Sequence, residues 1–160
     1  EGNSRNWIYN GGEWAWSEMI EPERRSFGLD MKTLPYAIEV EHYNNVAGSH
    51  QKIGVVHAGV SHNHESWGDF LSSLEENNPE TKRDAVWLRE VLSESVYSSF
   101  YEKPLAGVDL LIHGHTPVET PVKVGNRLHI DTALVYGKHL TVFEMDEDAF
   151  HTFKLVDKGV

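Results

Sequence analysis

The chain has 160 residues, of which 39% are hydrophobic and 24% charged, a composition typical of a soluble globular domain. Its formal net charge of −11 disfavours nucleic acid and anionic membranes as partners, because both would repel it. It has no cysteine, which excludes disulfides and thiolate metal sites, and no apolar run approaches the roughly 20 residues that span a bilayer. We therefore expect a single domain over residues 1–160, located in the cytoplasm.

The first third of the chain predicts short helices followed by strands. Residues 6–16 are rich in aromatic side chains and contain a Gly-Gly pair, which predicts a helix end, a turn at 10–12 and a second short helix. We expect the tryptophans of this segment to fill a core. Alternating apolar residues predict a strand at 37–41. Residues 44–51 look like a hairpin or loop, and residues 52–57 look like a buried strand.

The rest of the chain predicts a mixed α/β arrangement that ends in hairpins. Residues 62–80 are polar and indicate a long loop with one short helix, after which Pro79 opens a helix whose apolar residues recur at helical intervals over 84–101. A second buried strand is expected at 108–113. Turn residues then separate four further strands, at 122–124, 128–131, 140–145 and 150–156.

Two histidines follow the two buried strands. His57 ends the first and is followed by Ala58 and Gly59, and His115 comes two residues after the second, directly after Gly114. Ligand sites in open α/β sheets gather at the carboxyl ends of strands, and neutral imidazole is a common metal ligand. From spacing alone, each histidine is either a metal ligand or a hydrogen-bonded core residue.

Four segments in collinear order resemble the calcineurin-like metallophosphoesterases. Residues 55–60, 85–90, 112–117 and 130–133 read VVHAGV, AVWLRE, IHGHTP and IDTA. They look most similar to bacterial and phage serine/threonine protein phosphatases and to the related diadenosine-tetraphosphate phosphatases. The resemblance covers nearly the whole chain. It implies an α/β/β/α sandwich, of which this chain would hold the carboxyl-terminal portion with a mixed sheet.

The resemblance also implies roles for three residues. His57 and His115 would be catalytic residues that bind the same one of two divalent metal ions, and Arg89 would bind the substrate phosphate. Manganese is the expected metal, with iron or zinc as alternatives. A two-metal site activates water for attack on the ester, and a guanidinium makes bidentate bonds to a phosphoryl group.

Several other residues have two open interpretations. Asp131 is either a turn residue or a neighbour that supports the metal ligands, and Tyr136 either lines the cleft or lies on the surface. His113 is expected to be structural. His62 and His64 lie two apart, so they could bind an adventitious metal, but solvated loop histidines are the simpler expectation.

Three motifs of the family are absent from the sequence: Asp-x-His, Gly-Asp-x-x-Asp-Arg and Gly-Asn-His-Glu. They would supply the bridging aspartate, the remaining metal ligands and the general acid. We therefore expect this chain alone to be inactive. It could be a fragment whose amino-terminal segment was cleaved, was not traced or is a separate chain; one half of a split protein; or a non-catalytic, partner-binding remnant.

The predicted function is metal-dependent hydrolysis of phosphate monoesters once the amino-terminal half is present. The substrate would be a phosphoprotein, with phosphoserine or phosphothreonine, or another phosphate ester. The alternative activity within the same family is hydrolysis of dinucleoside polyphosphates.

Overall fold

The computed structural model describes residues 2–89 and 103–154, and the chain divides into two compact units, residues 1–35 and 36–160. Each unit is described by itself below, and the expectation of a single domain over residues 1–160 stays a prediction. Within the described ranges, none of the helices has the length and apolar character needed to cross a membrane.

The first unit consists of short helices, as the sequence predicts. Helix α1 covers Gly2–Trp7, a π-helical segment covers Ile8–Gly12, and helix α2 covers Trp14–Glu18. The expected turn at 10–12 is confirmed, because Asn10 and Gly11 leave the helical region and Gly11 has a φ of +93°. Helix α3, Glu21–Met31, begins with the Glu23 carboxylate accepting a hydrogen bond from the Ile20 backbone N–H.

The prediction that the tryptophans of this unit fill a core is wrong. Their exposed fractions are 38% for Trp7, 42% for Trp14 and 48% for Trp16. Two of them have a described partner: Trp14 packs against Phe27 in a T-shaped arrangement, and the Arg24 guanidinium lies over the Trp16 ring. The physical reason is size, because three short helices have too little interior to cover large aromatic side chains.

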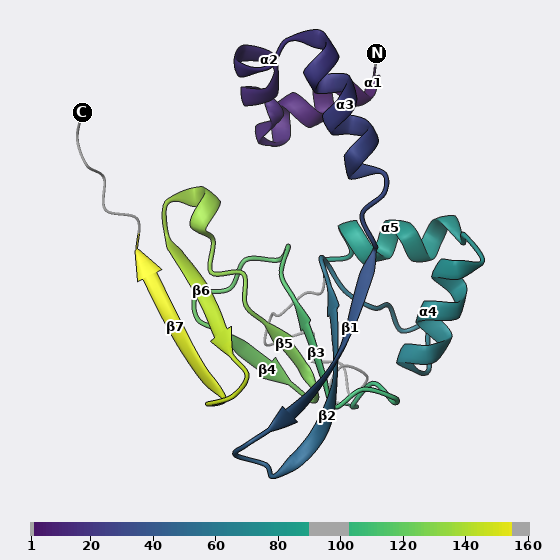
Figure 1. Cartoon of the computed structure of the whole chain (residues 1–160), viewed down its shortest axis with the longest axis vertical. Helices are drawn as coiled ribbons and strands as arrows, with labels where there is room; N and C mark the ends of the chain where they lie inside the picture. The colour runs from purple at the N-terminus through teal and green to yellow at the C-terminus, as the bar shows by residue number, and fades with distance from the viewer. Residues whose placement is uncertain (1, 90–102, 155–160) are drawn as a thin grey trace. The chain divides into compact units, whose positions relative to one another are not determined.

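The second unit is built on a mixed five-stranded sheet in the order β1-β2-β3-β5-β4 (Figure 1). The β2–β3 and β3–β5 pairs are parallel, and the β1–β2 and β4–β5 pairs are antiparallel. All five strands were predicted, with boundaries that shift by one to a few residues. Their bounds are Ala37–Asn44 for β1, Ser49–Val56 for β2, Leu110–His113 for β3, Val122–Val124 for β4 and Arg127–His129 for β5.

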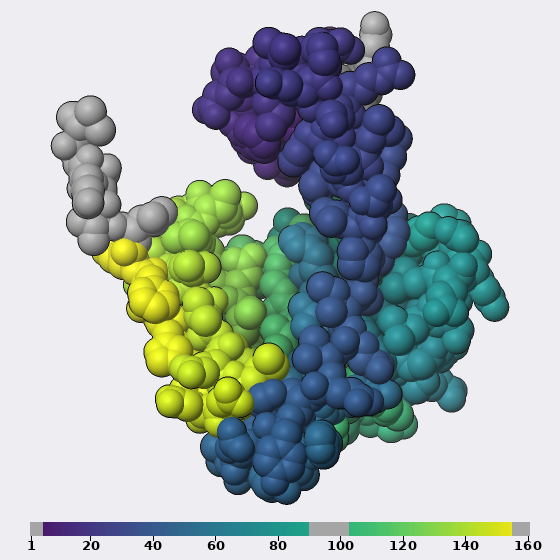
Figure 2. Space-filling view, in the orientation of Figure 1, coloured from purple at the N-terminus to yellow at the C-terminus, as the bar shows by residue number. Residues whose placement is uncertain are grey.

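Each face of the sheet is covered by a different element (Figure 1). Helices α4, Trp67–Glu75, and α5, Pro79–Trp87, lie against one face, and their atoms form one continuous surface in Figure 2. The hairpin of β6, His139–Glu144, and β7, Ala149–Lys154, supplies Phe143 to the apolar cluster on the other face. Strand β3 alternates between the two, with Leu111 in the helix-side cluster and Ile112 in the hairpin-side cluster. The expected mixed α/β class is confirmed.

Helix α5 differs most from its prediction. Pro79 opens it as expected, but it ends at Trp87. A helix that continued would use the Ala85 carbonyl to accept from residue 89, whereas that carbonyl accepts from the Ala58 backbone N–H at 2.8 Å. The tertiary contact thus replaces the next helical hydrogen bond. Residues 90–101 of the predicted helix and residues 155–156 of the last predicted strand lie outside the described residues.

Trp67 anchors the helix-side core by lying against a glycine of β2. Its ring is 1% exposed, and a Cβ added at Gly54 would lie 3.0 Å from two ring carbons. Its indole N–H donates to the Glu39 carboxylate at 2.8 Å, and Lys52 pairs with the same carboxylate at 3.3 Å. Gly54 therefore allows a close approach of the ring that a larger residue would prevent.

We expect Gly54→Ala to lower the free energy of unfolding by about 1–3 kcal/mol, because the added methyl overpacks against the Trp67 ring. Urea unfolding monitored by circular dichroism measures the change. The matched control is Gly28→Ala in α3, where nothing lies within 4 Å of the added Cβ. That variant should be neutral or more stable by up to about 1 kcal/mol. Equal stability of both variants would contradict the close packing.

Two histidines are buried side by side within the sheet. The His113 and His129 ring centroids are 3.9 Å apart, and the buried Arg127 guanidinium donates to the Val60 carbonyl at 3.1 Å. Burial, more than the charge of Arg127, lowers the pKa of His129 to about 4. Burial also lowers the pKa of His113, to about 3, with the charge of His129 as the next cause. Both rings are therefore neutral at neutral pH.

Stability should fall as the pH decreases below about 6.5, the ordinary pKa that His129 regains on unfolding. In the window between pH 6.5 and about 4 the unfolded chain binds a proton at His129 that the folded chain does not, so acid favours unfolding. Urea unfolding at a series of pH values measures the slope. His129→Leu should make the slope shallower while the contribution of His113 remains, and an unchanged slope in this variant would contradict the assignment to His129.

Candidate metal site at the ends of two parallel strands

The structure brings His57 and His115 together. His57 follows the last residue of β2, and His115 follows β3 after one glycine. Because β2 and β3 are parallel neighbours, their carboxyl ends meet at one edge of the sheet. His57 Nε2 lies 3.2 Å from His115 Nδ1, and the ring centroids are 5.0 Å apart.

Gly114 and an unusual backbone conformation position the second histidine. The Gly114 N–H donates to the His57 carbonyl at 3.0 Å, and a Cβ at Gly114 would lie 3.3 Å from the Asp131 Cβ. The next residue, His115, has a φ of +62°, in the left-handed region that non-glycine residues rarely adopt. This strained turn after a tightly packed glycine brings the His115 ring beside that of His57. Such strain is common at functional sites.

The two ring nitrogens have the separation of two ligands on one ion. Two imidazole nitrogens bound tetrahedrally to zinc lie about 3.3 Å apart, given the usual bond length. The observed 3.2 Å is the distance of a hydrogen bond between the two rings, and it is also compatible with a shared metal ion. His115 Nε2 is buried and has no hydrogen-bond partner in the described part of the chain, although metal-bound histidines usually donate from the second nitrogen.

His57 and His115 fit a metal ion as two members of a ligand set, but they do not form a complete set. Among the described residues, the one group of three or more candidate ligands close enough to share an ion is Glu144, Glu147 and His151, which lies on the β6–β7 hairpin. All three of these side chains are exposed. His57 and His115 alone are two neutral ligands, too few for a tight site, so a metal here requires further ligands from elsewhere.

The electrostatics of His115 identify its other neighbours. Burial is the first cause that lowers the pKa of His115, followed by the charges of His57 and Arg89, while Asp131 opposes the shift. Arg89 and Asp131 therefore lie within electrostatic range of the histidine pair. The Trp87 ring stands edge-on to His115 with centroids 5.6 Å apart. The lowered pKa keeps the His115 ring neutral, the form that binds a metal.

The remaining expected residues have more modest positions. Asp131 Oδ1 accepts from the Ala133 backbone N–H at 2.9 Å, so this residue is a turn residue as well as a neighbour of His115. Tyr136 lies in a 3-10 helix, Leu134–Tyr136, and is 73% exposed. Its role as a cleft residue stays a prediction. The expected structural role of His113 agrees with its hydrogen bond to the Ala58 carbonyl at 2.8 Å.

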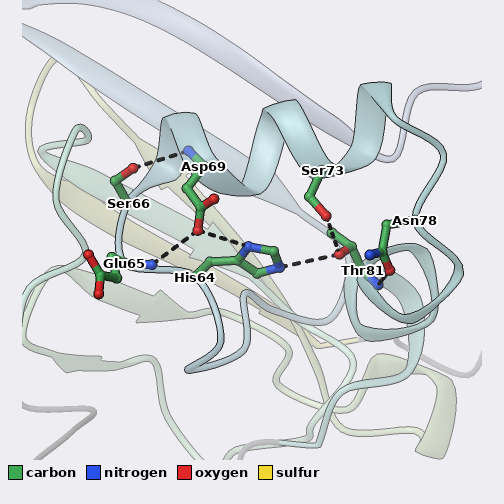
Figure 3. Close-up of polar contacts among 7 residues, drawn as sticks. All are labelled: His64, Glu65, Ser66, Asp69, Ser73, Asn78 and Thr81. Atoms are coloured by element: carbon green, nitrogen blue, oxygen red, sulfur yellow. Dashed lines mark hydrogen bonds and ion pairs between the residues drawn. The ribbon is translucent and has the colours of Figure 1, made fainter.

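Sequence reasoning was wrong about His64. His62 is exposed as expected, but His64 is buried, with Nδ1 3.2 Å from Asp69 Oδ2 and Nε2 3.3 Å from Thr81 Oγ1 (Figure 3). The spacing of two residues therefore does not place them on a common face. Sequence reasoning also assigned no role to Trp87 beyond helix packing; its position two residues before Arg89 was the available signal.

No protein-family model matches the chain. The resemblance to calcineurin-like metallophosphoesterases therefore stays a prediction, and the local geometry is the independent observation that bears on it. That geometry is the pairing of two histidine nitrogens at the ends of parallel strands, with an arginine and an aspartate in electrostatic range.

Added Mn²⁺ should broaden the ring NMR signals of His57 and His115 together, because the ion is paramagnetic and both rings reach one position. His115→Ala should strongly reduce the broadening at His57, since one imidazole holds the ion far more weakly than two. His151 serves as the internal reference, because it belongs to the exposed group of candidate ligands. Broadening at His151 without any at His57 would contradict the site.

Proposed function

We propose that this chain supplies part of the active site of a metal-dependent phosphoesterase of the calcineurin-like type. The reaction is hydrolysis of phosphate monoesters, with phosphoserine or phosphothreonine in proteins as the preferred substrate. The observation that carries the proposal is the 3.2 Å separation of His57 Nε2 and His115 Nδ1 at the carboxyl ends of β2 and β3. Ligand sites gather at this position in open α/β sheets.

Each histidine would hold the same divalent ion through the nitrogen that already faces its partner. When bound, a pair of such ions supplies Lewis acidity to the phosphate ester. Manganese is the proposed metal, with iron or zinc as alternatives, because imidazole accepts all three. The chain contributes the orientation of the two rings, which Gly114 and the left-handed backbone of His115 fix in advance.

Arg89 would bind the substrate. It is exposed, yet its charge contributes to the lowered pKa of His115, so its guanidinium has access both to solvent and to the region beside the histidines. A guanidinium bonds two phosphoryl oxygens at once and offsets their charge. The edge of Trp87 beside His115 supplies an apolar wall that limits water next to the ligand nitrogens.

The proposal requires partners for these residues. The described residues supply two metal ligands, so the bridging carboxylate and the general acid would come from the amino-terminal segment of the family, carried on the same or on a separate chain. The five-stranded mixed sheet, with helices on one face and the β6–β7 hairpin on the other, is compatible with the carboxyl-terminal portion of an α/β/β/α sandwich. We propose that the 160-residue chain alone has no activity.

The test is turnover of a generic aryl phosphate with and without Mn²⁺, on samples whose intact mass is known. The complete protein should show Mn²⁺-dependent turnover, and a sample with only the mass of this chain should show none. In the complete protein, Arg89→Ala should lower kcat/KM by about a hundredfold, because one charged contact to the phosphoryl group is lost. Lys123→Ala is the control, since Lys123 lines a separate pocket with Asp109 that includes none of His57, Arg89 and His115.

Two outcomes would replace the proposal. Faster hydrolysis of diadenosine tetraphosphate than of a phosphopeptide would change the substrate to dinucleoside polyphosphates. Absence of turnover by the complete protein with manganese, iron and zinc, together with saturable binding of a protein partner, would make the chain a non-catalytic remnant. Unchanged kinetics in Arg89→Ala would remove the phosphate-binding role of Arg89 alone.

A further inference from the structure

An apolar groove lies on the first unit, where residues of α1, α2 and α3 line it. Its volume is about 560 Å³. The apolar part of the lining consists of Trp7 at the end of α1, Trp16 in α2, and Phe27, Gly28 and Met31 in α3. All of these residues belong to the unit of residues 1–35, so the groove is separate from the candidate metal site.

The size and lining of the groove are those of a site for a small organic molecule. Pockets for such ligands have volumes of about 300–1,000 Å³, mostly apolar walls and a few polar groups that orient the ligand. Three of the lining side chains, Trp7, Trp16 and Phe27, are aromatic. Aromatic rings pack favourably against one another in stacked or edge-to-face arrangements. The groove therefore favours a ligand with an aromatic body.

Gly28 independently indicates that something from outside the chain fills the groove. It lies inside α3, where glycine is less favourable than alanine because it loses more conformational freedom on folding. A Cβ added at Gly28 would have no atom of the described chain within 4 Å, and the φ of Gly28 lies outside the left-handed region. Neither packing within the chain nor backbone conformation therefore requires the glycine. The missing side chain leaves space over the helix backbone, where the body of a ligand can approach closely.

The polar part of the lining supplies an available positive charge. It consists of Arg24, Arg25 and Glu21, so its net charge is opposite in sign to the −11 of the whole chain. Arg24 is held in the wall, because its guanidinium carbon lies 4.5 Å from the centre of the Trp16 ring and the group donates to the Met19 carbonyl. Arg25 is exposed, and its side chain makes no hydrogen bond or ion pair with the other residues that the structure describes. The Arg25 guanidinium can therefore bond to an anionic group.

We propose that this groove binds a small aromatic anion, an organic molecule with fused or linked rings and a carboxylate or sulfonate group. The rings lie over Gly28 among the aromatic side chains, and the anionic group bonds to Arg25. A second copy of the chain is a poor occupant, because two chains that each carry a net charge of −11 repel each other.

This binding goes beyond the phosphoesterase proposal and does not depend on it, because it uses no residue proposed for metal or phosphate binding. A failed binding test would leave the histidine pair unaffected, and absence of turnover would leave the groove unaffected.

The test is a fluorescence titration of the 160-residue chain with anilinonaphthalene sulfonate, an aromatic anion whose emission rises on binding. Phenylnaphthylamine, which has the same rings and no sulfonate, is titrated in parallel. The sulfonate should bind saturably at a single site and more tightly than the uncharged probe. Gly28→Leu should weaken binding of both probes about tenfold, because the leucine side chain fills the space over α3. Arg25→Gln should weaken binding of the sulfonate alone, about threefold, because an exposed charged contact is lost.

Two matched control variants should keep the affinity of the unaltered chain. Ser26→Leu adds the same side chain at an exposed position of α3 that is not part of the lining. Arg5→Gln removes an arginine of α1 that is also not part of it. Circular dichroism should show that both leucine variants keep their helix content, since leucine favours a helix more than glycine or serine does. If either variant loses it, Arg25→Gln and the comparison of the two probes decide.

Four results would overturn the proposal. They are absence of saturable binding, equal weakening by Gly28→Leu and Ser26→Leu, equal affinity of the chain for the two probes, and unchanged affinity for the sulfonate in Arg25→Gln. Sedimentation velocity tests the other occupant. A dimer that Gly28→Leu dissociates would assign the groove to a second copy of the chain and would also overturn the proposal.

Discussion

The register of β2 against β3 is the constraint on which the candidate metal site depends. Asp109 fixes one end of the pair: its carboxylate accepts from the Lys52 N–H at 2.7 Å, and its own N–H donates to the Lys52 carbonyl at 2.8 Å. At the other end the Gly114 N–H donates to the His57 carbonyl. A shift of one residue would turn every side chain of a strand to the opposite face. The approach of the two histidine rings therefore depends on hydrogen bonds at both ends of the strand pair.

The segment that follows β2 passes from the apolar interior to a polar part of the surface. After β2 the chain keeps Ala58 and Val60 in the interior, with the Ala58 N–H bonded to the Ala85 carbonyl. The segment then reaches Ser61, which lines a polar hollow together with His64 and Asp69. This one hydrogen bond, between Ala58 and Ala85, joins the end of β2 to α5, and it also ends the helix two residues later. The last helical residue, Trp87, has its ring next to that of His115.

Sequence reasoning predicted β2 and β3 well because burial on both faces leaves short continuous apolar runs, whereas β1 was predicted from its alternating pattern. The family resemblance implied that His57 and His115 bind the same metal ion and so lie near each other, and the parallel pairing of β2 and β3 brings them together. Sequence reasoning could not predict the burial of His64, because a polar loop gives no sign that Asp69 and Thr81 will meet it. The exposed tryptophans escaped prediction because composition does not tell how much interior a small unit has.

The outer edge of β1 has a consequence for self-association. β1 is the terminal strand of the sheet, so the backbone groups along its outer side have no neighbouring strand among the described residues. Such edges invite pairing with another copy of the chain. Here Glu39 and Glu41 lie two residues apart in β1. Antiparallel pairing with β1 of another copy would bring these like charges opposite one another. The glutamates therefore disfavour pairing of β1 with β1 of another copy. Pairing of β1 with a strand rich in lysine or arginine would meet no such repulsion.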